Sequence, residues 1–452
     1  MFRVIALGFL MFATLPADGS WTSLTDRAPP STWAGVWSSP STGHLLNVSA
    51  GGITVYHRDG ERCVEDTGLA PPASLLRVVA SDELQVQAYD FREFEDLMQV
   101  PQRFGRSSLG LADCVAVRTD ALPVEVFDEV WELFQRRYAF FDVRGVDWQA
   151  ARARYRPLAQ AARTDEELFA VLSLMLGELG DGHVNLSRGD LRFNAGRSGL
   201  RDRLDAAWRA DGSHGTAAAW RGAWQRESQA RVIALLDAGS HRTAADGALE
   251  WGRIGSTGYV RVNRFSAFAA GQDRPGQFEA LRQGLVRMKH DLASSRQLIV
   301  DVALNGGGSD AAAVMVAQVF ADEPRETLSY QAGDEPPQSV IVAPVFGPED
   351  RPVVLVTSEV TASAAECFVL MMRTFPHVVH VGEPTRGILS SLLPKPLSNG
   401  FMVTLSYQWV LDHRGQSFEG RGIEPQRRLE LFPPSDLRGG LAVAIGALAE
   451  QS

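Results

Sequence analysis

The sequence predicts a mixed α/β protein in which an N-terminal all-β domain and a helical subdomain precede the main core. Short alternating segments separated by Gly and Pro turns occupy residues 21–118, whereas apolar residues recur at helical spacing after Pro123. Further along, the buried apolar runs Val353–Thr357 and Val378–Gly382 flank a helical stretch. Strand, helix and strand in succession are typical of a βαβ unit in a parallel sheet.

Length and charge restrict the class of protein. A chain of 452 residues exceeds what one hydrophobic core usually organises, and its net charge of −10 argues against a nucleic-acid partner. Residues 1–20 combine Arg3, an apolar run and small residues, which is the pattern of a secretory signal peptide. No later segment is apolar enough to predict a membrane span. We therefore expect a secreted or periplasmic protein.

The three cysteines fit an oxidising compartment. Cys63 and Cys114 lie in the same N-terminal region and could form one disulfide. Cys367 is better explained as a small buried hydrophobe than as a reactive thiol. The sequence contains no C-x-x-C, H-E-x-x-H or P-loop pattern, so we expect no metal ion and no cofactor.

The first region contains the predicted strands of a small sandwich or barrel. These strands cover residues 35–37, 44–48, 53–57, 76–80, 84–89 and 115–118. Gly-Gly, Asp-Gly and Pro-Pro dipeptides separate them. The region shows no chemistry, so a packing role is favoured over a role in binding or as a lid.

A helical region follows and ends in a glycine-rich turn that carries His183. Thr164 and Glu167 form a capping-box pattern before the last predicted helix, and Gly180 and Gly182 then stop that helix. A histidine in such a turn is most often a solvated loop residue. Histidine is also the side chain best suited to act as a base at neutral pH, so His183 is a candidate catalytic residue.

Residues 190–255 are predicted to form a helical insertion with helices at 200–209 and 217–227. We expect this insertion to cover a cleft. Strands return at 259–263, and a long helix at 277–292 leads to an apolar strand at 297–302. That strand runs into the glycines 306–308. Glycines between a strand and a helix let backbone N–H groups approach a ligand closely, although a plain tight turn has the same pattern.

Ser363 occupies the most informative position, between a buried strand and a helix predicted at 364–374. Free N–H groups at a helix start can bind a developing oxyanion, and the helix dipole favours negative charge there. Ser363 and Glu366 also fit a capping box, which is a purely structural role. The G-x-S-x-G pattern of the α/β-hydrolases is absent. Ser363 therefore needs partners elsewhere to qualify as a nucleophile.

Four separated patterns occur in an order and spacing that resemble the S41 peptidase family. They are LGDGH at 179–183, VDVALNGGG at 300–308, TASAAE at 361–366 with GEPT at 382–385, and EGRGI at 419–423. The resemblance covers roughly residues 121–431. It implies a ClpP/crotonase-like core of stacked ββα units. The T-x-G-K pattern of the processing peptidases is missing, because Ile388 occupies the lysine position. The chain therefore looks closer to the tricorn-like branch, which includes the repeats of interphotoreceptor retinoid-binding protein.

The resemblance implies acyl transfer to a serine. Ser363 would attack a peptide carbonyl, and His183 would accept the serine proton and return it to the leaving amine. Glu419 would orient the imidazole, with Glu424 as the fallback. The backbone N–H groups of Ala364, Gly307 and Gly308 would form the oxyanion hole, in which one donor is typically worth about 3–4 kcal/mol. The implied partners are peptide or protein substrates.

Two departures from the family pattern, and two other functions, accompany this hypothesis. Ala303 stands where the family usually carries an arginine, and Gly182 stands where the tricorn site has a serine. A catalytically silent S41-like protein that binds an apolar ligand or peptide is the first alternative, although such a binder would not need both Ser363 and His183. An acyl-CoA enzyme of the crotonase type ranks last, because an export signal conflicts with cytosolic CoA.

The predicted division of the chain follows from these elements. It comprises a signal peptide (1–20), a small all-β domain (21–118), a helical subdomain that ends at the His183 turn (119–189), a helical insertion without a PDZ domain (190–255), a ClpP/crotonase-like catalytic core (256–432) and a C-terminal helix (433–452). Neither the oligomeric state nor the substrate preference can be predicted from the sequence.

Overall fold

The structure is a computed structural model that describes residues 22–23, 31–60, 62–65, 75–80, 83–87, 102–111, 114, 121–212 and 215–451. The predicted signal peptide and the predicted strand at 115–118 lie outside these residues. Four sheets and ten α-helices are present in the described part of the chain, so the mixed α/β prediction is confirmed. None of the described helices combines the length and the hydropathy needed to cross a bilayer.

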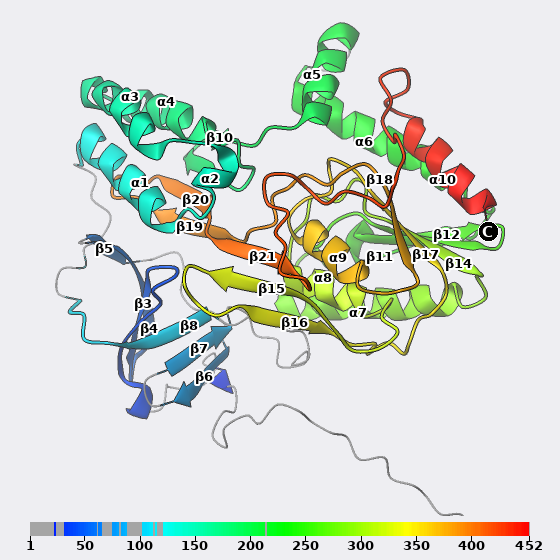
Figure 1. The fold of residues 1–452 in the computed structure, drawn as a ribbon, viewed down its shortest axis with the longest axis horizontal. Helices are drawn as coiled ribbons and strands as arrows, with labels where there is room; N and C mark the ends of the chain where they lie inside the picture. Colours follow the sequence, from blue (N-terminus) through cyan, green and yellow to red (C-terminus); the bar gives the residue numbers. More distant parts are fainter. Residues whose placement is uncertain are drawn as a thin grey trace, which may run out of the picture.

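The sheet that positions the site has seven strands in the order β11-β12-β13-β14-β17-β18-β22. Strands β11, β12, β14, β17 and β18 are labelled in Figure 1. Its strands are β11 (Arg242–Ala244), β12 (Leu249–Ile254), β13 (Thr257–Val262), β14 (Gln297–Asp301), β17 (Val353–Thr357), β18 (Val378–Gly382) and β22 (Arg427–Arg428). The first three are antiparallel, and every pair from β13 onward is parallel. The sheet thus starts at Arg242, ahead of the core boundary predicted at 256.

Helices cover both faces of this sheet. One face packs on α7 (Arg274–Asp291), α8 (Asp310–Ala317) and α9 (Ala364–Met372), and the other packs on α6 (Ala217–Ile233) and α10 (Gly440–Glu450). Helix α5 (Gly199–Asp211) lies beside α6, and the 3-10 helix η2 (Ala245–Gly247) joins β11 to β12. Neighbouring residues of one strand, such as Ile299 and Val300, join different cores because strand side chains alternate. Burial on both faces explains why these strands are continuous apolar runs.

A second core unites the helical region with strands from the C-terminal part of the chain. Helices α1 (Pro123–Arg137), α2 (Phe141–Arg144), α3 (Trp148–Ala161) and α4 (Asp165–Gly177) precede strands β9 (Asn185–Arg188) and β10 (Leu191–Asn194). These strands pair with β20 (Met402–Ser406) and β19 (Leu392–Pro396) in the order β10-β9-β20-β19. Apolar residues of both segments form one buried cluster. The His183 turn, just before β9, therefore lies beside strands that come from far along the chain.

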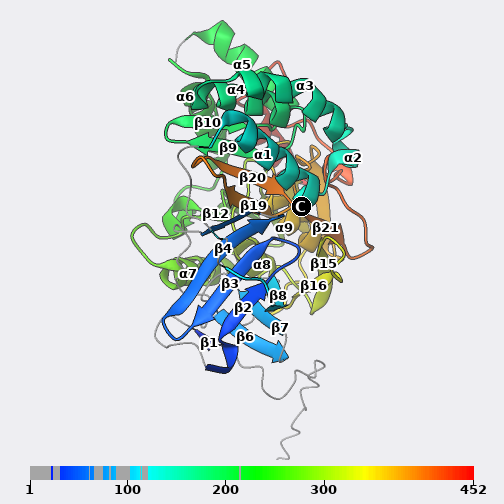
Figure 2. The same ribbon diagram turned by 90° about the vertical axis from the view of Figure 1, so that its left-hand side faces the viewer.

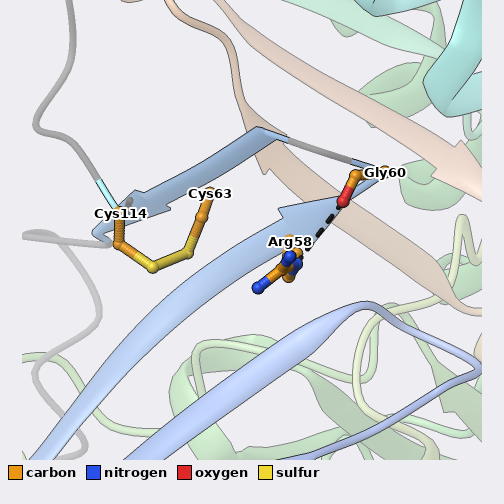
Figure 3. The surroundings of a disulfide bond; sticks show 4 residues. All are labelled: Arg58, Gly60, Cys63 and Cys114. Carbon is orange, nitrogen blue, oxygen red and sulfur yellow. Dashed lines mark hydrogen bonds between the residues drawn. A yellow bond between two sulfur atoms is a disulfide. The ribbon is translucent and has the colours of Figure 1, made fainter. Parts of the chain in front are cut away.

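The N-terminal sheet has the strand order β1-β6-β7-β8-β2-β3-β4-β5 and lies below the α1–α4 helices in Figures 1 and 2. It consists of β1 (Thr22–Ser23), β2 (Gly35–Ser38), β3 (His44–Ser49), β4 (Gly52–Asp59), β5 (Arg62–Glu65), β6 (Leu75–Ala80), β7 (Glu83–Gln87) and β8 (Gln102–Ser107), with the 3-10 helix η1 (Ser31–Trp33). Five of these strands were predicted, whereas β1, β5 and β8 were not. The Cys63–Cys114 disulfide is present (Figure 3), and Cys367 is a buried free cysteine, as predicted.

A small three-stranded sheet completes the described fold. Its order is β16-β15-β21, with β15 (Arg325–Ala332), β16 (Gln338–Val342) and β21 (Gln408–Asp412). Strand β21 follows β20 directly in the chain. The small sheet therefore connects the second core to the region beside α9, which packs against β15. The paired register of β14 and β17 brings Asp301 opposite Val356, so the segments that follow these strands leave the same edge of the main sheet. Ligand sites of α/β proteins commonly lie at this edge.

Candidate active site

Ser363 lies on a strained turn between β17 and α9. Its backbone has φ 59° and ψ −129°, a positive-φ conformation that is unusual for a residue other than glycine. Such strain costs on the order of 1–3 kcal/mol and is found at functional sites. Thr361 Oγ1 anchors the approach by donating to the Val302 carbonyl over 2.9 Å. The turn therefore holds the Ser363 side chain in a fixed place at the edge of the sheet.

The loop that follows β14 packs directly against this turn. A Cβ atom built on Gly307 would lie 2.7 Å from Ser363 Cβ, so only glycine allows the two segments to approach this closely. The Gly307 N–H donates to Asn305 Oδ1 over 2.8 Å and is therefore not available as an oxyanion donor. In the described ranges 121–212 and 215–451, the N–H groups of Gly308 and Ala364 have no hydrogen-bond partner. Two of the three predicted donors thus remain available.

Ser363 opens onto a cleft of about 460 Å³. Its lining includes Phe265, Phe268, Phe278, Gly308, Leu389 and Ser390. The walls combine aromatic side chains with charged and polar ones such as Arg274 and Asp310, and backbone amides lie at one end. Binding sites for organic ligands commonly have this composition.

His183 occupies the turn between α4 and β9 and is only 6% exposed. Its backbone N–H donates to Asp181 Oδ1 over 2.8 Å, and its carbonyl accepts from Thr404 Oγ1 over 2.6 Å. The ring contacts the backbone of Ser390, a residue of the Ser363 cleft. The ring Nδ1 is buried and has no hydrogen-bond partner among the described residues. The fold thus brings His183 to the segment that borders the cleft.

The environment of His183 keeps its imidazole neutral. Burial lowers the pKa of His183, and the positive charges of Arg144 and Arg386 lower it further. The carboxylate of Asp181 and the backbone of Ser390 act in the opposite direction. A neutral imidazole can accept a proton, so His183 is in the protonation state that a general base requires.

Glu419 is buried beside the same segment. Its carboxylate accepts from the N–H groups of Leu389 (2.7 Å) and Ser390 (3.0 Å) and from Arg144 Nη2 (2.6 Å). Within residues 121–212 and 215–451, no hydrogen bond joins it to the His183 ring. Burial, followed by the charge of Asp181, raises the pKa of Glu419 to about 8. Glu419 therefore binds the segment that contacts the imidazole. Its predicted role in orienting the imidazole is not supported by a direct hydrogen bond between the two side chains among the described residues.

The fallback residue Glu424 does not contribute to the site. Its side chain is 59% exposed and forms an ion pair with Arg428 over 2.7 Å. Glu424 directly follows the EGRGI pattern, on the segment that leads to β22. The spacing between Glu419 and Glu424 therefore carries them into different environments, one buried and one at the surface.

Sequence reasoning gave the second buried carboxylate, Glu366, only a capping role. It accepts the Ser363 N–H over 3.1 Å, which is the glutamate half of a capping box, whereas the serine hydroxyl makes no cap hydrogen bond. Glu366 also accepts from Thr385 Oγ1 (2.6 Å) and from the N–H groups of Gly387 (2.7 Å) and Ile388 (2.9 Å). The capping-box pattern identified the pairing with Ser363. It gave no sign that the same carboxylate fixes a distant loop.

A charged network behind His183 was also missed. Arg144 lies 2.6 Å from Glu419 and 3.8 Å from Asp181, and the Tyr138 hydroxyl donates to Asp181 over 2.9 Å. Of this network, the sequence patterns contained only Asp181, in LGDGH, and Glu419, in EGRGI. Arg144 and Tyr138 lie outside every pattern, so sequence spacing could not identify them.

Two carboxylates therefore hold one short segment of chain, residues 387–390. Glu366 binds the first two amides and Glu419 binds the next two. Ser363 lies at one side of this segment and His183 contacts it at Ser390. A serine hydroxyl and two free amides thus border the cleft, and an imidazole reaches the same segment; groups of these kinds are used in acyl transfer. The described residues include no group of three or more side chains placed to bind a metal ion.

Models of known families match the part of the chain that contains Ser363 and the helices that precede the His183 turn. The model of peptidase family S41 matches residues 256–429, and the model of the tricorn protease C1 domain matches residues 123–177. A carboxyl-terminal-processing peptidase 1 from Arabidopsis thaliana chloroplasts is 28% identical over 177 residues, which cover 38% of this chain and 33% of the relative. The chain thus matches about a third of the length of the curated relatives.

Solved structures support the fold. A candidate peptidase from Parabacteroides merdae superposes with a TM-score of 0.57 at 25% identity and covers 73% of this chain and 97% of its own. Mature CPAF in complex with lactacystin superposes with a TM-score of 0.52 at 13% identity, covering 73% of this chain and 98% of that one. These likenesses extend well beyond the region that the S41 model matches.

Proposed function

We propose that this chain, whose residues 256–429 match the model of peptidase family S41, is a serine peptidase in which Ser363 is the nucleophile and His183 the general base. The observation that carries the proposal is the strained Ser363 turn beside the free N–H groups of Gly308 and Ala364. A serine in that position presents its hydroxyl to a carbonyl whose oxygen can reach both amides.

The proposed reaction has two halves. Ser363 Oγ attacks the peptide carbonyl carbon while His183 accepts the hydroxyl proton, and Gly308 and Ala364 N–H stabilise the oxyanion. The C–N bond then breaks, and His183 passes its proton to the leaving amine, which leaves an ester on Ser363. Water, activated by the same imidazole, hydrolyses that ester. Asp181 next to the ring supports the transient imidazolium, and Glu419 assists by fixing Ser390.

Three broader predictions remain part of this proposal. The strand–helix–strand succession of β13, α7, β14 and later of β17, α9, β18 supports a ClpP/crotonase-like core, with the predicted domains around it. Residues 1–20 support export, and the Cys63–Cys114 disulfide accords with an oxidising compartment. The matched relatives include processing peptidases, which supports peptide or protein substrates.

Fluorophosphonate labelling tests the nucleophile. We expect the wild-type protein to be labelled and the Ser363→Ala variant to be inert, and we expect the same pattern for hydrolysis of fluorescent casein. Ser391→Ala is the matched control, because Ser391 lines the same cleft and, among the residues that the structure describes, its hydroxyl accepts a hydrogen bond only from Gln408. Labelling that survives Ser363→Ala, or a wild-type protein that is neither labelled nor able to cleave casein, would favour the silent peptide-binding alternative.

A further inference from the structure

The short helix α2 lies where the second core meets the loop that carries Glu419. Its first residue, Phe141, packs its ring against that of Tyr138, with the ring centroids 4.9 Å apart. Near the other end of the helix, Val143 packs on Gly420, where an added Cβ atom would lie 2.6 Å from Val143 Cγ1. This close approach requires a glycine. Helix α2 therefore joins the second core to the residue that follows Glu419.

Arg144, the last residue of α2, makes three polar contacts through one nitrogen atom. Its Nη2 lies 2.6 Å from Glu419 Oε1, donates to the Gly387 carbonyl over 3.3 Å, and lies 3.8 Å from Asp181 Oδ1. The side chain is only 11% exposed, so these contacts are largely shielded from water and salt. The three partners belong to the EGRGI loop, to the segment at 387–390 and to the turn of the proposed base. One guanidinium thus reaches three segments that are distant in sequence.

Gly387 is held from both sides. Its N–H donates to Glu366 over 2.7 Å, and Glu366 also accepts the N–H of Ser363 over 3.1 Å. The Gly387 carbonyl accepts from Arg144. Beyond Arg144, the side chain of Asp181 accepts the backbone N–H of the proposed base over 2.8 Å. A continuous chain of polar contacts therefore runs from the Ser363 turn to the turn of the base, and Arg144 is its link between the two cores.

The charge of Arg144 allows two carboxylates to lie near each other in the interior. Asp181 and Glu419 are both buried. Burial raises the pKa of Glu419, the charge of Asp181 raises it further, and the charge of Arg144 acts against both. Burial alone would lower the pKa of Arg144, but the charges of Asp181 and Glu419 outweigh burial, so this pKa is raised. Removing the guanidinium would leave two buried carboxylates without their shared cation, which is costly.

We propose that Arg144 is a positioning residue that locks the His183 turn to the segment at 387–390 and thereby sets the reach from the base to Ser363. This inference rests on the proposed peptidase function and adds to it a residue outside the cleft. Neither Arg144 nor any of its three partners lines the Ser363 cleft. The loss of Arg144 should therefore impair proton transfer more than substrate binding, so kcat should fall and KM should change little.

Two variants of Arg144 test this role on one fluorogenic peptide whose cleavage is lost in Ser363→Ala. We expect Arg144→Gln to lower kcat by about 10- to 100-fold, the effect of misplacing a catalytic group by about 1 Å, with KM within about threefold of wild type. Because all three contacts come from one nitrogen, the ammonium group in Arg144→Lys should recover part of the loss. Should Arg144→Gln not fold, a lower kcat at unchanged KM is sought in Arg144→Lys.

Arg351→Gln is the matched control. Arg351 is also a largely buried arginine, and it binds the Glu349 carboxylate over 2.6 Å and the Leu292 carbonyl over 2.7 Å, away from the cleft. Its replacement should lower the free energy of unfolding in urea and leave kcat within about twofold of wild type. A general loss of stability would affect the control and Arg144→Gln alike, whereas a positioning role would separate them.

The possible outcomes separate this inference from the proposed function. Unchanged kcat in Arg144→Gln, a change confined to KM, or an equal fall of kcat in Arg351→Gln would overturn the inference and leave the proposed function intact. A wild-type protein without Ser363-dependent cleavage would overturn the proposed function. Crystal structures of wild type and Arg144→Gln then decide the inference alone, because the gap between the His183 ring and Ser363 Oγ should widen by about 1 Å or more in the variant. An unchanged gap would overturn the inference.

Discussion

The Ser363 turn and the His183 turn are fixed by different physical means. Ser363 belongs to the core under the parallel sheet, and its position is set by backbone geometry: a left-handed φ of 59° and a glycine loop packed against it. His183 belongs to the second core, and its position depends on a buried charged network of Asp181, Arg144 and Glu419. The proposed nucleophile is therefore held by backbone sterics and by one hydrogen bond from its N–H to Glu366, and the proposed base is held by charges. We expect mutations to damage the two turns in different ways.

The largest effect should come from His183, the proposed base. Replacing His183 with Gln removes the proton acceptor but preserves the approximate size of the side chain, so kcat/KM for casein peptides should fall by at least about 10³-fold. His377→Gln is the matched control, because His377 bonds the Phe320 carbonyl at the opposite end of β17. Near wild-type turnover in His183→Gln would remove His183 from the mechanism.

The same contrast explains how much of the site the sequence could predict. Ser363 and the glycine loop are local patterns: a buried strand, a turn and a helix start lie within a dozen residues, so their geometry follows from their order. The strands Val353–Thr357 and Val378–Gly382 were predicted with their correct bounds for this reason. The LGDGH turn was found in the same way.

The network behind His183 could not be predicted, because it joins residues that are distant in sequence. Arg144 reaches Glu419 across 275 positions, and no spacing rule connects them. Glu424 was a reasonable fallback by spacing, yet it points to solvent. Strands β11 and β12 were missed for a related reason. They pair as an antiparallel extension of a parallel sheet, and their short alternating pattern resembled an insertion.

The next effect tests whether geometry alone holds the Ser363 turn. Glu366→Gln replaces one acceptor oxygen with an amide group that faces backbone donors, so the loop of Gly387 and Ile388 should shift. We expect kcat/KM to fall by about 10- to 100-fold and the free energy of unfolding to fall by about 3 kcal/mol, measured by urea denaturation. Glu349→Gln, a buried carboxylate that binds Arg351 away from the cleft, should lower stability without lowering the activity of the folded protein. Unchanged activity in Glu366→Gln would show that the turn needs no carboxylate.

A smaller effect should appear in the pH profile. The positive charge of Arg386 disfavours the imidazolium and so lowers the pKa of His183. Removing that charge in Arg386→Gln should raise the pKa of His183, so activity should be lost at a higher pH as the solution is acidified. We expect the acid limb of kcat/KM to move to higher pH, most clearly at low salt. Arg421→Gln should leave this limb in place, and a downward shift in Arg386→Gln would contradict the assigned geometry.

The smallest effect concerns a buried ionic cluster that lies outside the site. Lys395 of β19 is 1% exposed and lies 2.9 Å from Asp59 of β4, which also binds Arg137 over 2.7 Å. This cluster joins the N-terminal sheet to the second core. Burial lowers the pKa of Lys395 to about 8, whereas a lysine in an unfolded chain titrates near 10.4. Between these values the unfolded chain binds more protons, so the free energy of unfolding should rise with pH from about 8 to about 10.4.

Lys395→Met should remove this rise and otherwise change little. An apolar side chain of similar length replaces a buried ion, Asp59 retains Arg137, and such replacements are often close to neutral, so we expect a change within about 1 kcal/mol at pH 7. Urea unfolding at pH 7 and pH 10 measures both values. Peptidase activity should stay within about twofold of wild type, because Lys395 touches neither turn. A variant whose stability keeps the wild-type dependence on pH would show that another group titrates there. If the same variant lost activity, the charges that hold the N-terminal sheet would also help to position the base.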